Sequence, residues 1–280
     1  MSVEDAYCRR LLRGHYENFW VSGPLVPRAR RADLARVYAF CRTVDDLGDE
    51  SRDPEDARAR LELWRQDVKR LWAGATPTHP VLLALRETIR TRALPQEPFS
   101  DLIDANLQDQ VVASYASWAP LIDYCRRSAA PVGRIVLHLF GISSSELLLA
   151  SDDVCIGLQL ANFAQDVAVD AEKGRVYLPQ AEIQERGMRG AIEATCRRAW
   201  RLLQAGHGLE AATGGGLRVQ LALYRLGGEA VLRAVERGGY RTDRERPTVS
   251  AAGKVKLLAV ALTGQTQRGK HADHYHVDHA

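Results

Sequence analysis

The sequence of 280 residues has little of what marks several classes of protein. Its five cysteines are far apart and form no CxxC pair, which predicts reduced thiols in a cytoplasmic protein rather than disulfides or metal ligands. The net charge of +3 is small for this length, so no nucleic-acid partner is expected. The chain also lacks an N-terminal export signal and a run of about 18 uncharged apolar residues, so no membrane-spanning helix is expected.

Strand signals are nearly absent, and helical periodicity fills most of the chain. Asp53 and Pro54 predict a capped helix start, with Asp53 as the N-cap and Pro54 at the first helical position. Neither a repeat nor a linker divides the chain, so we expect one all-α domain over residues 1–269. Helices are expected at Val3–Tyr16, Arg31–Asp49, Pro54–Trp72, Pro80–Arg92, Phe99–Ser114, Trp118–Leu139, Ser144–Ala150, Asp152–Asp170, Ala181–Glu185, Gly190–Ala211, Leu217–Arg237 and Ala251–Leu262.

The last residues, 270–280, form a His-rich tail with few apolar residues to dock it. Histidines at this spacing could bind a metal, but a disordered tail is the favoured interpretation. The histidines are His271, His274, His276 and His279.

One long, mostly apolar helix is expected to carry a line of polar side chains. At about 100° per residue, Gln159, Asn162, Asp166 and Asp170 fall along one strip of that helix. A helix that is apolar on most sides is normally buried, and buried carboxylates must be paired or must hold a cation. The strip therefore predicts a cavity wall that faces a metal ion or cationic groups.

A second acidic pair ends the helix predicted at Arg31–Asp49. Leu34, Tyr38 and Cys41 form an expected inward stripe, and steps of three or four residues continue it to Asp45 and Asp49. The plain alternative is a solvated acidic helix end. The helix dipole disfavours acidic residues at a C-terminus, so that alternative leaves their position unexplained.

Two facing acidic pairs repel each other unless divalent cations lie between them. Mg²⁺ takes one or two carboxylates and completes its octahedral shell with water and phosphate oxygens. The residues therefore predict a Mg²⁺–diphosphate site at one mouth of a helical bundle. A mostly apolar bundle below it would suit a diphosphate with a hydrocarbon tail.

These segments resemble motifs of the squalene/phytoene synthase family. Tyr38-Ala-Phe-Cys-Arg-Thr-Val-Asp-Asp-Leu-Gly-Asp49 is similar to the first aspartate motif of the family, and Gln159 to Asp170 with Lys173-Gly-Arg-Val-Tyr-Leu-Pro179 is similar to the second. Asp123-Tyr-Cys125 with Pro131-Val-Gly133 resembles the helix that carries the active-site tyrosine. The resemblance runs from about Tyr7 to Tyr240, and it implies an isoprenoid synthase bundle with a central active-site cavity.

Within the family, the details resemble hydroxysqualene synthases of bacterial hopanoid biosynthesis. The segments that carry this likeness are His15-Tyr-Glu-Asn-Phe19, Cys125 to Arg134 and Asn162-Phe-Ala-Gln-Asp-Val167. The resemblance implies Mg²⁺-dependent conversion of presqualene diphosphate and water to hydroxysqualene and diphosphate. No NADPH is expected, which agrees with the absence of a dinucleotide fingerprint after a strand.

The resemblance also assigns roles by position. Asp45 and Asp49 would hold Mg²⁺ on one wall, and Asp166 and Asp170 on the other, with two or three ions in all. Tyr124 would face the reacting centre as a proton carrier or as a stabilising dipole. Asn162 would complete the metal shell, and the remaining substrate-binding candidates are Arg42, Gln159, Lys173, Arg175, Tyr177 and Asn18.

Several positions depart from the family pattern. Tyr16 and Asn18 stand where many relatives have serines in a diphosphate-binding segment. Gln165 stands where carotenoid-forming relatives have a basic residue, and a tyrosine of some relatives is replaced near Gly227-Gly228. Ala164 stands where a Trp is usual in the hydroxysqualene branch, and loss of that ring would enlarge the pocket.

Other functions stay open at this point. The nearest is head-to-head condensation of two farnesyl diphosphates to presqualene diphosphate or a C30 carotenoid precursor. A non-catalytic family member that acts as a binding or assembly partner is a second, although all four key aspartates are present. A cyclising terpene synthase is a third, but its second metal motif usually mixes Asn, Ser/Thr and Glu.

Partners beyond the prenyl diphosphate substrate also stay open. Because C30 products are insoluble, peripheral contact with the inner face of the membrane is conceivable, as is handover to or from other squalene-pathway enzymes. The helix expected at Ala251–Leu262 is one candidate surface, although a buried core helix is the favoured assignment.

Overall fold

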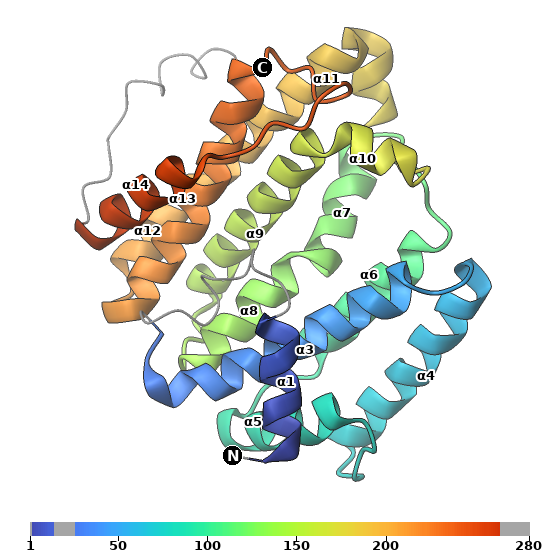
Figure 1. Cartoon of the computed structure of the whole chain (residues 1–280), viewed down its shortest axis with the longest axis vertical. Coiled ribbons are helices and arrows are strands. Elements are labelled where there is room, and N and C mark those ends of the chain that lie inside the picture. Colours follow the sequence, from blue (N-terminus) through green and yellow to red (C-terminus); the bar gives the residue numbers. More distant parts are fainter. Residues whose placement is uncertain (1, 14–25, 264–280) are drawn as a thin grey trace.

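The computed structural model describes residues 2–13 and 26–263. Within these ranges the regular structure is helical, apart from an isolated parallel bridge between Ser114 and Val176. The predictions for Tyr16, Asn18 and the tail over 270–280 lie outside the described residues. The helices in Figure 1 are α1 (Val3–Arg13), α3 (Arg28–Asp49), α4 (Pro54–Trp72), α5 (Pro80–Arg92), α6 (Glu97–Asp109), α7 (Trp118–Ser128), α8 (Ala130–Leu139), α9 (Ser145–Gln165), α10 (Val167–Glu172), α11 (Gln180–Leu203), α12 (Gly206–Ala211), α13 (Gly215–Arg237) and α14 (Ala251–Thr263).

Helix starts with clear capping chemistry were predicted correctly. The Asp53 carboxylate accepts a 2.8 Å hydrogen bond from the Asp56 backbone N–H, and Pro54 occupies the first helical position of α4. Both α4 and α5 have the predicted bounds. A side-chain acceptor at the N-cap satisfies a backbone N–H that has no partner inside the helix, so the sequence locates these starts well.

Helix interruptions were predicted less well. The helix expected at Trp118–Leu139 is divided at Ala129, because Pro131 lacks a backbone N–H and its ring disturbs the preceding turn. The helix expected at Phe99–Ser114 ends at Asp109. The helix expected at Ala181–Glu185 and the first part of the one expected at Gly190–Ala211 are joined into α11 across a kink at Gly187, whose φ of 68° is readily adopted by glycine. The last part of the second expected helix is the separate helix α12.

Two hydrophobic cores support the architecture. The first lies among α1, α3, α4, α5, α6 and α8, and the second lies mainly among α7, α9, α11 and α13. Helix α3 packs against α1, α4, α5, α6 and α8, while α9 packs against α7, α8, α10, α11, α12 and α13. Figure 1 shows α9 running through the middle of the bundle, so the two helices with acidic motifs belong to different cores.

The buried face of α3 differs from the predicted stripe. Leu34 is buried as expected, but the core side continues through Val37, Phe40 and Val44. Tyr38 and Cys41 are only half-buried at the edge of this face. Because two neighbouring stripes share Leu34, helical spacing alone did not decide which one faces the core. Asp45 and Asp49 continue the outer stripe, where they remain exposed.

The five cysteines are free thiols, as predicted. Among the described helices, α9 alone has the length and composition to cross a membrane. Half of that apolar window is buried inside the protein, and core helices often meet the same criterion.

Candidate active site

The predicted strip from Gln159 to Asp170 does not lie on one uninterrupted helix. Helix α9 ends at Gln165, Asp166 has φ −104° and ψ 19°, and α10 begins at Val167. This corrects the prediction of a helix over Asp152–Asp170. The backbone N–H of Asp170 still donates to the Asp166 carbonyl at 2.8 Å, so the two carboxylates remain on consecutive turns.

A segment from the far end of the chain explains the break. We call residues 238–250, which connect α13 to α14, the C-terminal strap; Figure 1 shows it crossing the bundle near the end of α9. The Thr242 hydroxyl donates to the Ala164 carbonyl at 2.6 Å, and the Thr242 carbonyl accepts the Ala168 N–H at 3.2 Å. The Ala164 carbonyl and the Ala168 N–H would bond to each other in a continuous helix, and here both bond to Thr242 instead. The helix can therefore be interrupted at this point without leaving buried polar groups unpaired.

The strap also contacts the acidic strip directly. The Arg246 guanidinium donates to both carboxylate oxygens of Asp166, at 2.5 and 3.2 Å. The Gln165 side chain donates to the Pro247 carbonyl at 2.7 Å. Gln165 thus anchors the strap, at the position where carotenoid-forming relatives were expected to carry a basic residue.

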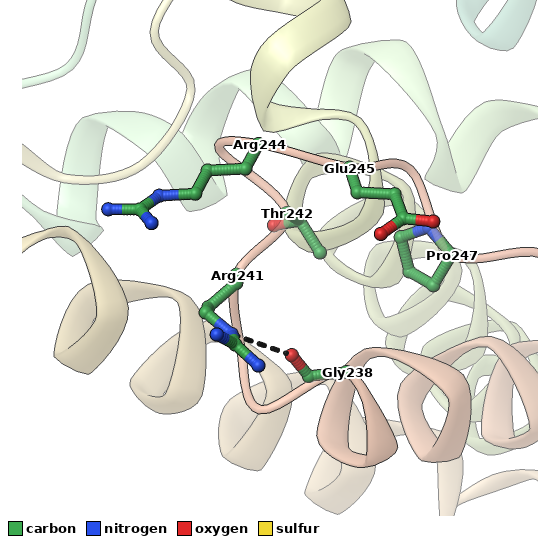
Figure 2. Close-up of a pocket in the computed structure, with 6 residues that line it drawn as sticks. All are labelled: Gly238, Arg241, Thr242, Arg244, Glu245 and Pro247. Carbon is green, nitrogen blue, oxygen red and sulfur yellow. Dashed lines mark hydrogen bonds between the residues drawn. The ribbon is translucent and has the colours of Figure 1, made fainter.

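A cavity of about 370 Å³ lies beside these contacts. Figure 2 shows Arg241 bonded to the Gly238 carbonyl on one side, with Glu245 and Pro247 on another. Ala164 is fully buried, and its carbonyl accepts the hydroxyl of Thr242, one of the residues that line this cavity. The cavity is lined by Gly238, Arg241, Thr242, Arg244, Glu245 and Pro247.

The first acidic motif lies where α3 meets α6. The Asn106 amide donates to the Asp45 carboxylate at 3.4 Å. A Cβ on Gly48 would lie 2.8 Å from the Asn106 Oδ1 atom, so a larger residue there would require the Asn106 amide to shift. Gly48 is therefore part of what places an amide beside Asp45.

The turn after α10 carries the predicted basic residues. The Gly174 N–H donates to the Ala171 carbonyl at 3.0 Å, and the Arg175 N–H donates to the Asp170 carbonyl at 2.9 Å. With φ of 71° at Gly174, this is a Schellman motif, which reverses the chain at the helix end. The motif holds Lys173 and Arg175 immediately beyond the second acidic strip.

Ion pairs join the two acidic walls. An Arg175 nitrogen lies 3.2 Å from one Asp49 carboxylate oxygen, and the Lys173 Nζ atom lies 3.7 Å from the other. The structure therefore brings Asp49 to the motif that carries Asp170, although the two are far apart in the chain. These contacts confirm that the two acidic motifs are neighbours; the roles of the individual residues remain predictions.

Among the residues that the structure describes, three further predicted site residues form no hydrogen bond or ion pair between the two acidic motifs: Arg42, Gln159 and Asn162. The Arg42 guanidinium pairs with Asp46 at 2.5 Å and Glu50 at 3.2 Å, on the flank of α3 and not across the site. Gln159 is half-buried and Asn162 is exposed on α9.

A half-buried carboxylate that was not among the predicted site residues lies beside the predicted tyrosines. The Tyr124 hydroxyl donates to Asp109 Oδ2 at 2.6 Å, and the Tyr177 hydroxyl donates to Asp109 Oδ1 at 3.3 Å. The two rings, both buried, belong to a stack with Phe163, which lies parallel to Tyr177 at 4.0 Å between centroids. Faces of aromatic rings attract cations, so this stack suits an apolar site for a carbocation.

Three carboxylates in this region hold their protons unusually well. Burial raises the pKa of Asp45, Asp109 and Asp170 to about 6. The Asp45 side chain is accessible to water, yet many protein atoms surround it, so its carboxylate is still poorly solvated. Neighbouring carboxylates raise the pKa further, with Asp49 acting on Asp45 and Asp166 acting on Asp170. Burial likewise raises the pKa of Tyr124 and Tyr177, so both remain protonated.

The oxygen donors suit Mg²⁺. In the described part of the chain, Asp45 and Asp170 make no ion pair, while Asp49 and Asp166 are paired with basic side chains. No group of three or more His, Cys, Asp or Glu residues there converges on one metal position. This distribution fits ions that each take one or two carboxylates and draw further ligands from water and diphosphate.

Helical spacing could have indicated part of what was missed. Asn106 and Asp109 lie three residues apart near the C-terminus of α6, where the helix dipole disfavours an acid. The same argument had singled out Asp45 and Asp49. Arg246 carried no such signal, because its partner is 80 residues away.

Comparisons with known proteins agree with this geometry. Helices with facing acidic ends around an aromatic interior define a synthase of the isoprenoid class, and the squalene/phytoene synthase family model matches residues 12–253. The chain therefore belongs to the squalene/phytoene synthase family, whose members are prenyltransferase-like enzymes of isoprenoid biosynthesis.

Individual relatives differ in activity. The chain is 35% identical to presqualene diphosphate synthase of Rhodopseudomonas palustris, over 61% of either protein. It is 31% identical to 15-cis-phytoene synthase of Synechococcus elongatus, over 65% of this chain and 63% of that one. The aligned segments thus span less than two thirds of these relatives.

A solved structure is similar over a longer range. Squalene synthase HpnC from Alicyclobacillus acidocaldarius is 44% identical with a TM-score of 0.80, covering 85% of this chain and 94% of that one. The predicted all-α fold of the isoprenoid synthase type is confirmed.

Proposed function

We propose that the chain converts presqualene diphosphate and water to hydroxysqualene and diphosphate with Mg²⁺. The 44% identity to a squalene synthase over most of both chains supports a reaction that leads to squalene. The observation that carries the choice of presqualene diphosphate is the resemblance of the sequence motifs to the hydroxysqualene branch. The substrate class, a prenyl diphosphate, is consistent with the family.

The proposed metal shell uses carboxylates from both walls. Asp45 and Asp49 on α3, with Asp166 and Asp170 at the α9–α10 junction, would hold Mg²⁺, and Asn162 would complete the shell. When bound, Mg²⁺ stabilises the leaving diphosphate by neutralising its developing charge. Asp49 and Asp166 would exchange their basic partners for the metal.

Basic side chains at the site would take up the diphosphate. Lys173 and Arg175 already lie at the boundary of the two walls, where released cationic groups can pair with phosphate oxygens. Arg42 would need to leave Asp46 and Glu50 to join them. Gln159 and Asn18 complete the proposed substrate-binding set.

The interior would protect the cation after the diphosphate leaves. Tyr124, Tyr177 and Phe163 form a buried aromatic stack, and aromatic rings beside a bound cation would stabilise its charge and keep bulk water away. The buried Tyr124 hydroxyl is a fixed dipole at this point. Water captures the cation to give the alcohol, so the reaction needs no hydride donor.

Condensation of two farnesyl diphosphates is the second candidate. The presqualene diphosphate synthase and phytoene synthase relatives support it, because their names describe head-to-head condensations. Their identity to this chain is lower and extends over a shorter range than that of the squalene synthase structure.

The two candidates predict different substrates. Purified protein with Mg²⁺ and without NADPH is incubated separately with farnesyl diphosphate and with presqualene diphosphate, and the extracted lipids are identified by mass spectrometry. We expect hydroxysqualene from presqualene diphosphate alone. Turnover of farnesyl diphosphate by itself would contradict the proposal and support condensation.

Asp166→Asn tests the metal assignment in the same assay. The substitution keeps the size of the side chain but removes a charged ligand, so product formation should fall by about 10²-fold or more. Unchanged product formation would contradict the metal assignment. Wild-type protein that is itself inactive with both substrates would instead favour a family member that binds without catalysis.

A further inference from the structure

The Tyr124 hydroxyl already donates its proton in a hydrogen bond to Asp109. A phenol has one O–H donor, and Tyr124 donates it to Asp109 Oδ2 at 2.6 Å, a short distance typical of a bond to a charged acceptor. Any further hydrogen bond of the Tyr124 oxygen must therefore be one that it accepts. Tyr124 is thus held as a hydrogen-bond acceptor toward anything that lies on the other side of its oxygen.

Asp109 is placed to keep this arrangement. Its other oxygen accepts the Tyr177 hydroxyl at 3.3 Å, so both oxygens have donors from different segments. Burial raises the pKa of Asp109 to about 6, and the positive charge of Arg175 opposes that rise. Asp109 is consequently ionised at neutral pH, yet it binds a proton more readily than an exposed aspartate does.

The four motif aspartates are less suited to take a proton. Asp49 and Asp166 are paired with basic side chains, and all four belong to the proposed metal shell. Asp109 instead faces the aromatic interior through Tyr124 and Tyr177, which lie in the stack with Phe163. Asp109 is therefore linked to the aromatic stack by hydrogen bonds from two hydroxyl groups.

We propose that Asp109, acting through Tyr124, accepts the proton of the water that captures the carbocation. This inference rests on the proposed function and assigns the base for its last step. The water oxygen forms a bond to the cationic carbon and gives one proton to the Tyr124 oxygen, while the Tyr124 proton passes to Asp109. The products are the neutral alcohol, an unchanged tyrosine and a protonated Asp109, so atoms and charge balance.

Asp109 is therefore a positioning residue and proton acceptor that need not touch the substrate. The released diphosphate is the other base within the site. Substitution of Asp109 distinguishes these two bases. It stops proton transfer through Tyr124 to Asp109 but leaves the released diphosphate able to accept the proton.

Asp109→Asn separates loss of the diphosphate from capture by water. The variant is assayed with presqualene diphosphate and Mg²⁺ for two quantities, the rate of diphosphate release and the share of hydroxysqualene among the C30 products. We expect that release falls by less than about tenfold, while hydroxysqualene formation falls by about 10²-fold, a usual contribution of a general base. Equal losses in both quantities, or an unchanged product share, would overturn the relay.

Asp101→Asn is the matched control. Asp101 lies on the same helix two turns earlier, and burial raises its pKa as well, but its charged neighbours are Glu97, Asp104, Arg127 and Arg134. Neither quantity should change in this variant. A similar loss of hydroxysqualene there would show a general effect of charge on α6 and would overturn the assignment.

A double variant tests that Asp109 acts through Tyr124. Tyr124→Phe removes only the hydroxyl, so its product share should match that of Asp109→Asn, and the double variant should be no worse than either. Multiplied losses would indicate two independent roles. If Asp109→Asn does not fold by circular dichroism, Tyr124→Phe carries the same test of product share.

Failure of this inference differs from failure of the proposed function. Wild-type protein that forms no hydroxysqualene would overturn both. Wild-type protein that forms it, with an Asp109→Asn variant of unchanged product share, would overturn only the relay and leave diphosphate as the base.

Discussion

Asp49 and Asp109 have different chemical roles because their carboxylates lie in different environments. Asp49 lies exposed between Lys173 and Arg175, whereas Asp109 is half-buried and bonded to neutral hydroxyls. Hydroxyls stabilise the charge less than a guanidinium does, so burial prevails and the pKa of Asp109 rises to about 6. The same residue type thus serves as an ion-pair partner at one position and as a proton acceptor at another.

The raised pKa predicts how Asp109 affects stability as pH changes. In the unfolded chain an aspartate has a pKa of about 3.9, so between that pH and 6 the folded protein binds more protons. Stability contributed by this carboxyl is therefore lost as pH rises through that window. Asp109→Asn should gain free energy of unfolding relative to wild type between pH 4.5 and pH 7.5.

Urea unfolding of both proteins at the two pH values, with divalent metals chelated, measures this difference. Asp45 and Asp170 titrate in both proteins. The charge of Asp109 is one cause of the raised pKa of Asp170, so its removal also lowers that pKa and changes the stability difference in the same direction. A difference that is independent of pH, or that changes in the opposite direction, would contradict the assigned environment.

Helix α4 illustrates structure that depends only on neighbouring residues. Asp53 caps the backbone N–H of Asp56, and Pro54 has no N–H to satisfy. Helix α9 illustrates the opposite case, because its end at Gln165 depends on Thr242 from a distant segment. Local chemistry determines a helix end where the cap lies in the next few residues.

Asp53→Ala tests the local case. Loss of the capping oxygen should lower the free energy of unfolding by about 1 kcal/mol, because one backbone N–H at the start of α4 loses its partner. Urea denaturation followed by circular dichroism measures the change. Asp53→Asn is the control, since asparagine caps about as well, and equal losses in both variants would exclude capping as the cause.

Across the whole molecule, the C-terminal strap brings residues from the end of the chain to the second acidic motif. Arg246 reaches Asp166, and Thr242 and Gln165 secure the crossing. Arg246 neutralises a carboxylate that the proposed function assigns to Mg²⁺. The metal must therefore compete with Arg246 for Asp166.

Arg246→Gln should bind Mg²⁺ more tightly when substrate is absent. A partly exposed ion pair contributes about 0.2–1 kcal/mol, so we expect the dissociation constant to fall by about 1.4- to fivefold. Isothermal titration calorimetry with MgCl₂ measures it. Arg244→Gln removes the same charge from the same strap and should change the affinity less; equal effects would indicate general electrostatics, and no effect would contradict competition.

Much of the site could be predicted because its residues follow helical spacing. Asp45 with Asp49, and Asp166 with Asp170, are each four residues apart, so each pair was visible in the sequence. The prediction of their proximity depended on charge, since facing carboxylates need cations between them. Arg175 and Lys173 supply part of that charge in the structure.

The sequence by itself determined the all-α class, the capped helix starts and the two acidic motifs, because these depend on periodicity and on contacts within one or two turns. Only the tertiary structure decided that Asp109 lies against Tyr124, that Thr242 opens the helix after Gln165, and that Arg246 reaches Asp166. Each of these contacts joins segments that share no local pattern. Their partners are selected by packing, which brings otherwise unsatisfied polar groups together.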